Sequence, residues 1–163
     1  MINKELYKAA EKTVEALKER NLKIATAESC TGGMVASFIT SVAGVSDVFE
    51  FGITSYSCRI KNEILGVKAE TLEQFGAISS QTAGEMAVNV RKKSGADIGV
   101  SVTGAAGHDG SEGHPAGYVF IGIDGKNGTA VKLLNIEPES RNFVRETAVL
   151  ELFKLINTYI EEA

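Results

Sequence analysis

The sequence predicts an α/β protein in which helices cover both faces of a mixed β-sheet, a layered α/β/α single domain over residues 1–163. Segments rich in β-branched and apolar residues alternate with segments whose apolar residues recur at helical spacing. Two consecutive strand-like segments flank a turn-forming insert, which predicts an antiparallel hairpin. No Pro- or Ser-rich linker divides the chain, so we expect one folded unit.

The first half of the chain begins with an expected helix over residues 3–20. Asn3 can cap this helix, and its apolar residues recur every three or four positions. A strand is expected at residues 22–27, a helix at 34–40 opened by two glycines, and a second strand at 49–57. Short helices are expected at residues 60–65 and 71–75, each followed by a glycine that can end it.

The second half begins with a longer helix from Ser80, in which one stripe is apolar: Ala83, Met86, Ala87 and Val90. A strand follows at residues 97–103 and then a glycine-rich loop to about residue 117. Residues 118–123 and 129–136 are expected to pair as a hairpin around the insert 124–128. A last helix, capped by Ser140, is expected from residue 141 to about residue 160.

Composition excludes several classes of protein. Hydrophobic residues make up 44% of the chain and charged residues 23%, which is typical of a globular domain and not of a disordered or fibrous one. No long apolar run and no signal peptide is found, so we expect a cytoplasmic protein without a membrane partner. The net charge is −4 and the basic residues are scattered, which argues against a nucleic-acid partner. Cys30 and Cys58 are expected to be free thiols.

The first candidate site lies where the first strand passes into the next helix, in the segment AESCTGG (residues 27–33). Such a turn presents Ser29 at the carboxyl edge of the sheet, where open α/β sheets bind ligands. The amides at the start of the helix can hold an oxyanion or a phosphate, and Gly32 and Gly33 let a ligand approach the backbone closely. A purely structural interpretation, with Ser29 or Thr31 as a helix cap, stays open.

The second candidate site is the segment YSCRIK (residues 56–61), where another strand ends and a helix begins. Tyr56 and Lys61 should therefore lie near the same edge of the sheet. A lysine can act as the base for a serine nucleophile only when it is neutral, and burial or the first turn of a helix disfavours its ammonium form. A nearby tyrosine hydroxyl could relay the proton. The alternative is a solvated lysine at a helix start.

Two further motifs indicate anion binding. The loop TGAAGHDG (residues 103–110) follows a strand, and its successive amides can hold an anion. Arg141 and Arg145 lie one helical turn apart at the start of the last helix, where their charge opposes the helix dipole unless an anion is bound. A metal site would have to use the polar residues of the loop, and we expect none: His108, Asp109, Glu112 and His114.

In combination and order, these motifs resemble the CinA C-terminal domain family. The segments that carry the resemblance are AESCTGG, SVAGVSDVFEFGITSYSCRIKNEILGV, TLEQFGAIS, GADIGVSVTGAAG and AGYVFIGI, which span about residues 22–123. A fainter match continues to Arg141 and Arg145. The larger family architecture adds an amino-terminal nucleotide-pyrophosphatase-like domain, and we expect this chain to be a stand-alone form.

Members of this family are nicotinamide-nucleotide amidohydrolases, which convert nicotinamide mononucleotide and water to nicotinate mononucleotide and ammonia in pyridine-nucleotide salvage. The resemblance implies Ser29 as nucleophile, Tyr56 as supporting tyrosine and Lys61 as base, with no metal or organic cofactor. Together, the motifs and the resemblance predict the following substrate-binding residues: Cys30, Thr31, Gly32, Gly33, Ser46, Thr103, Gly104, Ala105, Gly107, Arg141 and Arg145.

This sequence departs from the family pattern at the mouth of the expected site. Ala105 replaces a bulkier residue, His108 stands near a usual proline, and Cys58 replaces an asparagine. Two other functions stay open: a thiol amidase with Cys30 as nucleophile and His108 as base, and a module that senses pyridine nucleotides without turnover. We also expect a homo-oligomer, because the sheet and the last helix leave apolar surface.

Overall fold

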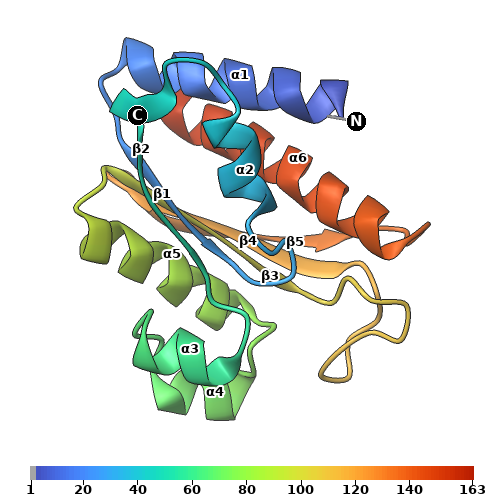
Figure 1. The fold of residues 1–163 in the computed structure, drawn as a ribbon. Helices are drawn as coiled ribbons and strands as arrows, with labels where there is room; N and C mark the ends of the chain where they lie inside the picture. The colour runs from blue at the N-terminus through green and yellow to red at the C-terminus, as the bar shows by residue number, and fades with distance from the viewer. Residues whose placement is uncertain (1–2) are drawn as a thin grey trace.

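In the computed structural model, which describes residues 3–163, five strands form one mixed sheet in the order β2-β1-β3-β4-β5 (Figure 1). β1 pairs in parallel with both β2 and β3, whereas β3 and β4, and β4 and β5, are antiparallel. The predicted mixed sheet is thereby confirmed. The strand bounds are β1 (Ile24–Glu28), β2 (Phe49–Thr54), β3 (Ile98–Gly104), β4 (Tyr118–Gly125) and β5 (Gly128–Asn135).

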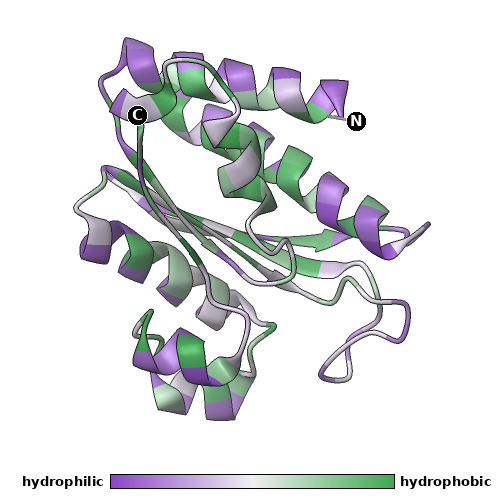
Figure 2. Cartoon of the chain, viewed as in Figure 1, coloured by the Kyte–Doolittle hydropathy of each residue, from purple (hydrophilic) through white to green (hydrophobic). Residues whose placement is uncertain are grey.

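Helices cover both faces of the sheet, which confirms the predicted layering. One face carries α1 (Lys4–Glu19), α2 (Met34–Thr40) and α6 (Arg141–Glu161), and the other carries α3 (Cys58–Glu63), α4 (Ala69–Phe75) and α5 (Ser80–Ser94) (Figure 1). A short 3₁₀ helix that the sequence did not predict, η1 (Val45–Asp47), precedes β2. Hydrophobic and hydrophilic bands alternate along α1, α5 and α6 in Figure 2, as expected of helices that bury one side. Within the part of the chain described, no helix is both long and apolar enough to cross a membrane.

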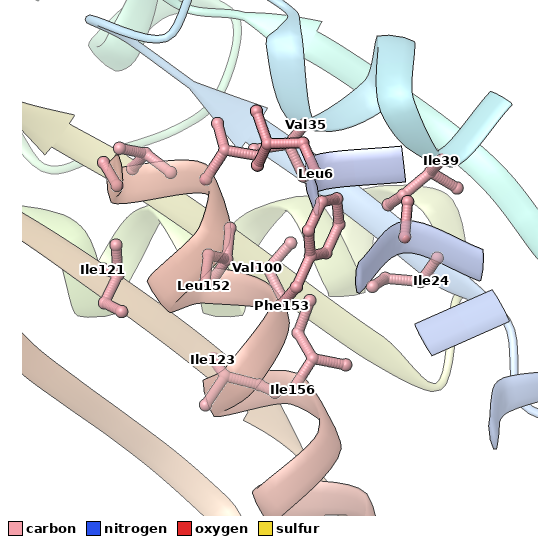
Figure 3. Packing of buried hydrophobic residues seen from close by; sticks show 14 of the residues in the cluster. Leu6, Ile24, Val35, Ile39, Val100, Ile121, Ile123, Leu152, Phe153 and Ile156 are labelled. Atoms are coloured by element: carbon pink, nitrogen blue, oxygen red, sulfur yellow. The ribbon is translucent and has the colours of Figure 1, made fainter. Parts of the chain in front are cut away.

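The main core lies between α6 and the sheet. Leu152, Phe153 and Ile156 of α6 pack toward Ile24 of β1 and Ile123 of β4, and all five side chains are fully buried (Figure 3). Burial of each such side chain contributes roughly 1.5–3 kcal/mol to folding. The amino-terminal part of α6 lies next to the carboxyl end of β1, where Arg145 donates to the carbonyls of Cys30 and Thr31.

Helix caps follow the predictions at both ends of the chain. The Asn3 side chain accepts hydrogen bonds from the amides of Glu5 and Leu6 at the start of α1. Ser140 accepts one from the amide of Phe143 at the start of α6. The cap of α2 is Gly33, whose φ of 99° lies in the left-handed region that favours glycine.

The second strand and the helix after it differ from the prediction in their bounds. β2 ends at Thr54, and α3 begins at Cys58, because the Ser57 hydroxyl caps the helix by accepting from the amide of Ile60. The amide of Lys61 makes the first full-turn hydrogen bond of α3, to the Ser57 carbonyl (2.9 Å). Lys61 therefore follows the first turn and does not lie within it, so the helix dipole is not what disfavours its charge.

Topology brings five segments to one edge of the sheet. Ser29, Ser55 and Ala105 each follow the carboxyl end of β1, β2 or β3, which run in parallel. β4 begins at this edge, where Val119 pairs with Gly104, and β5 ends there before the chain enters α6. The candidate residues from separate motifs therefore meet at this edge.

Candidate active site

A cavity of about 400 Å³ opens at this edge, a size suited to a small ligand. Ser29 and Lys61 line its inner part, and Arg141 lines it from the start of α6. Its other walls come from residues 56–58, 77–78, 103–107 and 110–112. The structure thus brings the predicted nucleophile, the predicted base and the glycine-rich loop into one cavity.

Ser29 and Lys61 are in direct contact. The Nζ atom of Lys61 lies 2.9 Å from the Oγ atom of Ser29. The same amine donates to the carbonyl oxygens of Ser55 (2.7 Å) and Tyr56 (3.0 Å). These two carbonyls match the two N–H bonds of a neutral amine, which leaves its lone pair for the proton of Ser29. The geometry suits proton transfer from the serine to the lysine.

Lys61 is among the largest fully buried side chains, with 1% of its surface exposed. Burial lowers the pKa of Lys61 below its ordinary value of 10.5, while Cys58, Cys30 and Glu112 act weakly in the opposite direction. Aside from the Ser29 hydroxyl, its hydrogen-bond partners are carbonyl oxygens and not carboxylates. The site therefore favours a neutral lysine, which is the form that a base requires.

Tyr56 enters the site differently from the prediction. Its carbonyl oxygen contacts Lys61, but its side chain is 59% exposed. Its hydroxyl accepts a hydrogen bond from Nη2 of Arg141 (3.0 Å). The hydroxyl thus lies at the rim of the cavity with Arg141, and no contact with Ser29 or Lys61 places it as a proton relay.

The turn that carries Ser29 is held from inside the protein by Glu28. The Glu28 carboxylate is 1% exposed and accepts hydrogen bonds from the Thr31 hydroxyl (2.7 Å) and from the amides of Val35 (2.8 Å) and Ala36 (3.1 Å). It therefore fastens the start of α2 to the end of β1. Sequence reasoning missed this role, although an acidic residue at the end of an otherwise uncharged strand was the available signal.

Within the predicted substrate-binding segment 30–33, only Cys30 lines the cavity. Thr31 is fully buried, and Gly32 and Gly33 border a separate hollow behind the turn. Burial raises the pKa of the Cys30 thiol to about 11, although Arg141, Arg145 and Lys61 each lower it somewhat. A thiol with that pKa is protonated near neutral pH, which makes Cys30 a poor nucleophile.

The histidine that the thiol alternative requires is also misplaced. His108 borders a different surface hollow, is exposed, and its ring contacts Asp109 (3.3 Å). His114 stacks on Tyr118, with ring centroids 4.3 Å apart. Within residues 3–163, no group of three or more His, Cys, Asp or Glu side chains is placed to hold a metal ion.

The glycine-rich loop forms a wall of the cavity beside Ser29, whose amide donates to the carbonyl of Val102 at the end of β3 (2.9 Å). Thr103, Gly104, Ala105 and Gly107 all line it, as predicted. The Thr103 hydroxyl is turned away, because it donates to the carbonyl of Ala77 (2.7 Å). The amide of Ala105 donates to the carbonyl of Tyr118 (2.9 Å), so this amide is not available to an anion.

Glu112 fastens the far end of this loop, a contact that the sequence did not reveal. Its carboxylate accepts hydrogen bonds from the amides of Ala77 (3.3 Å) and Ile78 (3.1 Å), which form the adjacent wall. Its φ of 51° is in the left-handed region, which is uncommon outside glycine. Glu112 therefore determines how the loop meets the turn between α4 and α5.

The two arginines of α6 have separate positions. Arg141 lines the cavity, and its guanidinium lies beside Gly107, where a Cβ atom would come within 3.1 Å of Nη1. Arg145 lies outside the cavity and donates to the carbonyls of Cys30 and Thr31, each at 3.0 Å. The structure brings Arg141 to the cavity and does not bring Arg145 there.

Ser46 is also not brought to the cavity within this chain. It lies in η1, exposed, just before Phe49 begins β2. Phe49 pairs with Ile24, the first residue of β1, so Ser46 lies at the opposite edge of the sheet from Ser29. The six residues of β2 between these edges span about 20 Å.

Comparisons with known proteins give one consistent family. The model of the CinA C-terminal domain matches residues 6–160. A CinA-like protein of Kosmotoga olearia is 49% identical over 138 residues, which cover 84% of this chain and 33% of that protein. The chain spans about a third of the length of the first curated relatives that it matches (35%, 36% and 33%).

Solved structures agree in fold over nearly the whole chain. The competence/damage inducible protein CihA from Agrobacterium tumefaciens has a TM-score of 0.92 and 32% identity, with 97% of both chains covered. A CinA superfamily protein from Klebsiella pneumoniae has a TM-score of 0.94 and 27% identity, covering 97% of this chain and 99% of its own.

Proposed function

Because this chain belongs to the CinA C-terminal domain family, we propose that it is a nicotinamide-nucleotide amidohydrolase, which converts nicotinamide mononucleotide and water to nicotinate mononucleotide and ammonia. The observation that carries the proposal is the 2.9 Å contact between the buried amine of Lys61 and the hydroxyl of Ser29. This pair lies in a cavity large enough for a nucleotide, and its geometry suits acyl transfer from an amide.

In the first half of the reaction, neutral Lys61 takes the proton of Ser29 while the serine Oγ attacks the carboxamide carbon. The C=O bond becomes a C–O⁻ oxyanion, which the amides that follow Ser29 stabilise. When the oxyanion collapses, the C–N bond breaks and the leaving nitrogen takes the proton from Lys61. Ammonia departs, and the nicotinoyl group remains as an ester on Ser29.

In the second half, water enters the position that ammonia has left. Lys61 is neutral again and takes a proton from the water, whose oxygen attacks the ester carbon. Collapse of the second oxyanion breaks the bond to Ser29 Oγ, which recovers its proton from Lys61. Nicotinate mononucleotide leaves, and the enzyme is restored without any metal or organic cofactor.

Arg141 is our candidate for the phosphate of the substrate. It stands at the rim of the cavity, where its guanidinium donates to the Tyr56 hydroxyl and Gly107, without a Cβ, leaves room for it. A phosphate there would be well separated from Ser29 and Lys61 at the inner end. Tyr56 thus supports the reaction through its carbonyl contact with Lys61 and its hydroxyl contact with Arg141.

Ammonia release from nicotinamide mononucleotide by the purified protein tests the proposal, with Ser29→Ala as the inactive control. Nicotinamide riboside, which lacks the phosphate, should be a poorer substrate, and Arg141→Ala should raise KM for the mononucleotide about 10- to 150-fold. Nucleotide binding without any ammonia release would refute the amidohydrolase and favour a sensing module.

A further inference from the structure

Arg145 is a half-buried arginine, and each of its three side-chain nitrogens donates to an acceptor within the protein. Nε donates to the carbonyl of Cys30 and Nη2 to the carbonyl of Thr31, each at 3.0 Å. Nη1 donates to the side chain of Asn142 (2.9 Å). Within residues 3–163, Arg145 makes no ion pair with a carboxylate. Its charge is thus directed at the turn that follows Ser29.

These contacts fix consecutive peptide planes, because the carbonyl and the amide of a trans peptide point in opposite directions. Holding the carbonyl of Cys30 fixes the direction of the Thr31 amide, and holding the carbonyl of Thr31 fixes that of the Gly32 amide. The Gly32 amide in turn donates to the carbonyl of Ser29 (3.0 Å). That last bond fixes the peptide between Ser29 and Cys30, and with it the amide of Cys30.

The amide of Cys30 is well placed to act on the reacting carbonyl. Cys30 follows the nucleophile directly and lines the same cavity as Ser29. Within the described chain, its amide donates to no other residue. The amide after a nucleophilic serine is a common donor to the oxyanion in acyl transfer.

The turn is clamped from two sides. Glu28 holds the Thr31 hydroxyl from inside (2.7 Å), and Arg145 lies over the outer side, where a Cβ on Gly32 would come within 3.5 Å of Nη2. Gly32 itself has a φ of 60°. A positive charge beside this turn also favours negative charge near Ser29, since Arg145 lowers the pKa of Cys30 against the larger, opposite effect of burial.

We propose that Arg145 is a positioning residue for the oxyanion site: it fixes the peptide planes from Ser29 to Gly32 and so aims the amide of Cys30 at the developing negative charge. The assignment rests on the proposed function for its substrate, but it also predicts the reactivity of Ser29 toward other acyl-type reagents. It replaces the predicted role of Arg145 as a phosphate ligand.

The test measures how fast a fluorophosphonate labels Ser29, followed by intact mass, because the phosphoryl oxygen of this probe occupies the oxyanion position. Arg145→Met should slow labelling about 10²–10³-fold, the usual effect of losing one oxyanion donor. The labelling rate of Arg145→Lys should lie between those of the wild type and Arg145→Met, since an ammonium cannot hold both carbonyls as a guanidinium does. Arg59→Met removes an exposed arginine that, among residues 3–163, pairs only with Glu63, and it should leave the rate within twofold of wild type.

The kinetics of nicotinamide mononucleotide turnover give a second measurement, in which a positioning role and a merely structural role of Arg145 predict different results. Arg145 variants that remain folded by circular dichroism should lose kcat with KM nearly unchanged, whereas Arg141→Ala should mainly raise KM. A folded Arg145→Met protein that labels at the wild-type rate would overturn the proposal. So would a rise in KM at constant kcat, which would restore Arg145 as a phosphate ligand.

Two outcomes separate this inference from the proposed function. If the wild-type protein labels at Ser29 but releases no ammonia, the amidohydrolase assignment fails, while the labelling rates still decide the role of Arg145. If wild-type Ser29 does not label, no oxyanion site is formed and the inference fails. If Arg145→Met does not fold, the Arg145→Lys rate decides: a rate equal to wild type overturns the inference.

Discussion

Substituting Lys61 with methionine removes the amine but keeps an unbranched side chain of similar length in a fully buried position. The change leaves the Ser29 hydroxyl and the carbonyls of Ser55 and Tyr56 without their donor. Turnover should be lost, because the variant has no group in contact with Ser29 that can take its proton. A second, quantitative consequence concerns the pH dependence of stability.

Burial lowers the pKa of Lys61 in the folded protein, whereas in the unfolded chain it should be near 10.4. Between these two values the unfolded state binds a proton that the folded state does not. The free energy of unfolding therefore rises with pH in that window by about 1.4 kcal/mol per unit. The loss of stability caused by burying Lys61 is complete below its folded-state pKa and disappears above its unfolded-state pKa. Lys61→Met lacks this contribution.

Urea denaturation from pH 6 to pH 10, followed by circular dichroism, measures the difference. The wild-type curve should rise relative to Lys61→Met above the folded-state pKa, and activity should rise with pH around the same midpoint. Lys12→Met, at an exposed position on α1, is the matched control and should track the wild type. Parallel curves for wild type and Lys61→Met would mean that Lys61 is charged near neutral pH, which refutes its role as base.

Four further predictions follow from the same cavity. Ser29→Ala should abolish turnover and Cys30→Ser should retain most of it, because burial raises the pKa of that thiol to about 11; the reverse pattern in an ammonia-release assay would establish a thiol mechanism. The Ser29→Ala, Lys61→Met double variant should be little worse than either single one, since both act as one unit, and additive losses would contradict this. Turnover should persist in chelator, and loss restored by one divalent ion would refute the cofactor-free mechanism. Glu112→Ala should raise KM by loosening the wall at Ala77 and Ile78, and unchanged steady-state kinetics would dismiss that role.

The encounter of Ser29 with Lys61 was predictable in outline because both follow the carboxyl ends of parallel strands. The burial of Lys61 was not, since a lysine on a short helix after an edge strand is normally solvated. Its burial depends on how α3 packs, which involves residues distant in sequence. The cause of its lowered pKa was therefore predicted only in part: burial contributes, and the helix dipole does not.

The orientation of Tyr56 shows a second limit of sequence reasoning. The motif places Tyr56 near Lys61, and its backbone is there, but its side chain points outward. Ser55 is fully buried and its neighbour Tyr56 is exposed, in keeping with the alternation of extended chain. Only the position of Ser55 relative to the core decides which of the two faces inward, and that position follows from the register of β2 with β1.

Arg141 and Arg145 illustrate why residues on one helix face need not share a function. Four residues along an α-helix correspond to a shift of about 6 Å. Such a shift leaves both residues packed against the same neighbouring elements, but it is enough to move a side chain from the cavity rim to a position outside the cavity. Here that shift separates a guanidinium at the mouth of the cavity from one that lies behind the Ser29 turn. Only Arg141 lies in the first turn of α6, where the helix dipole opposes its charge, and in our proposal a bound phosphate offsets this; Arg145 lies beyond the first turn and donates to carbonyl oxygens. The anion-binding argument from the sequence therefore applies to one arginine, because the other already has partners that carry partial negative charge.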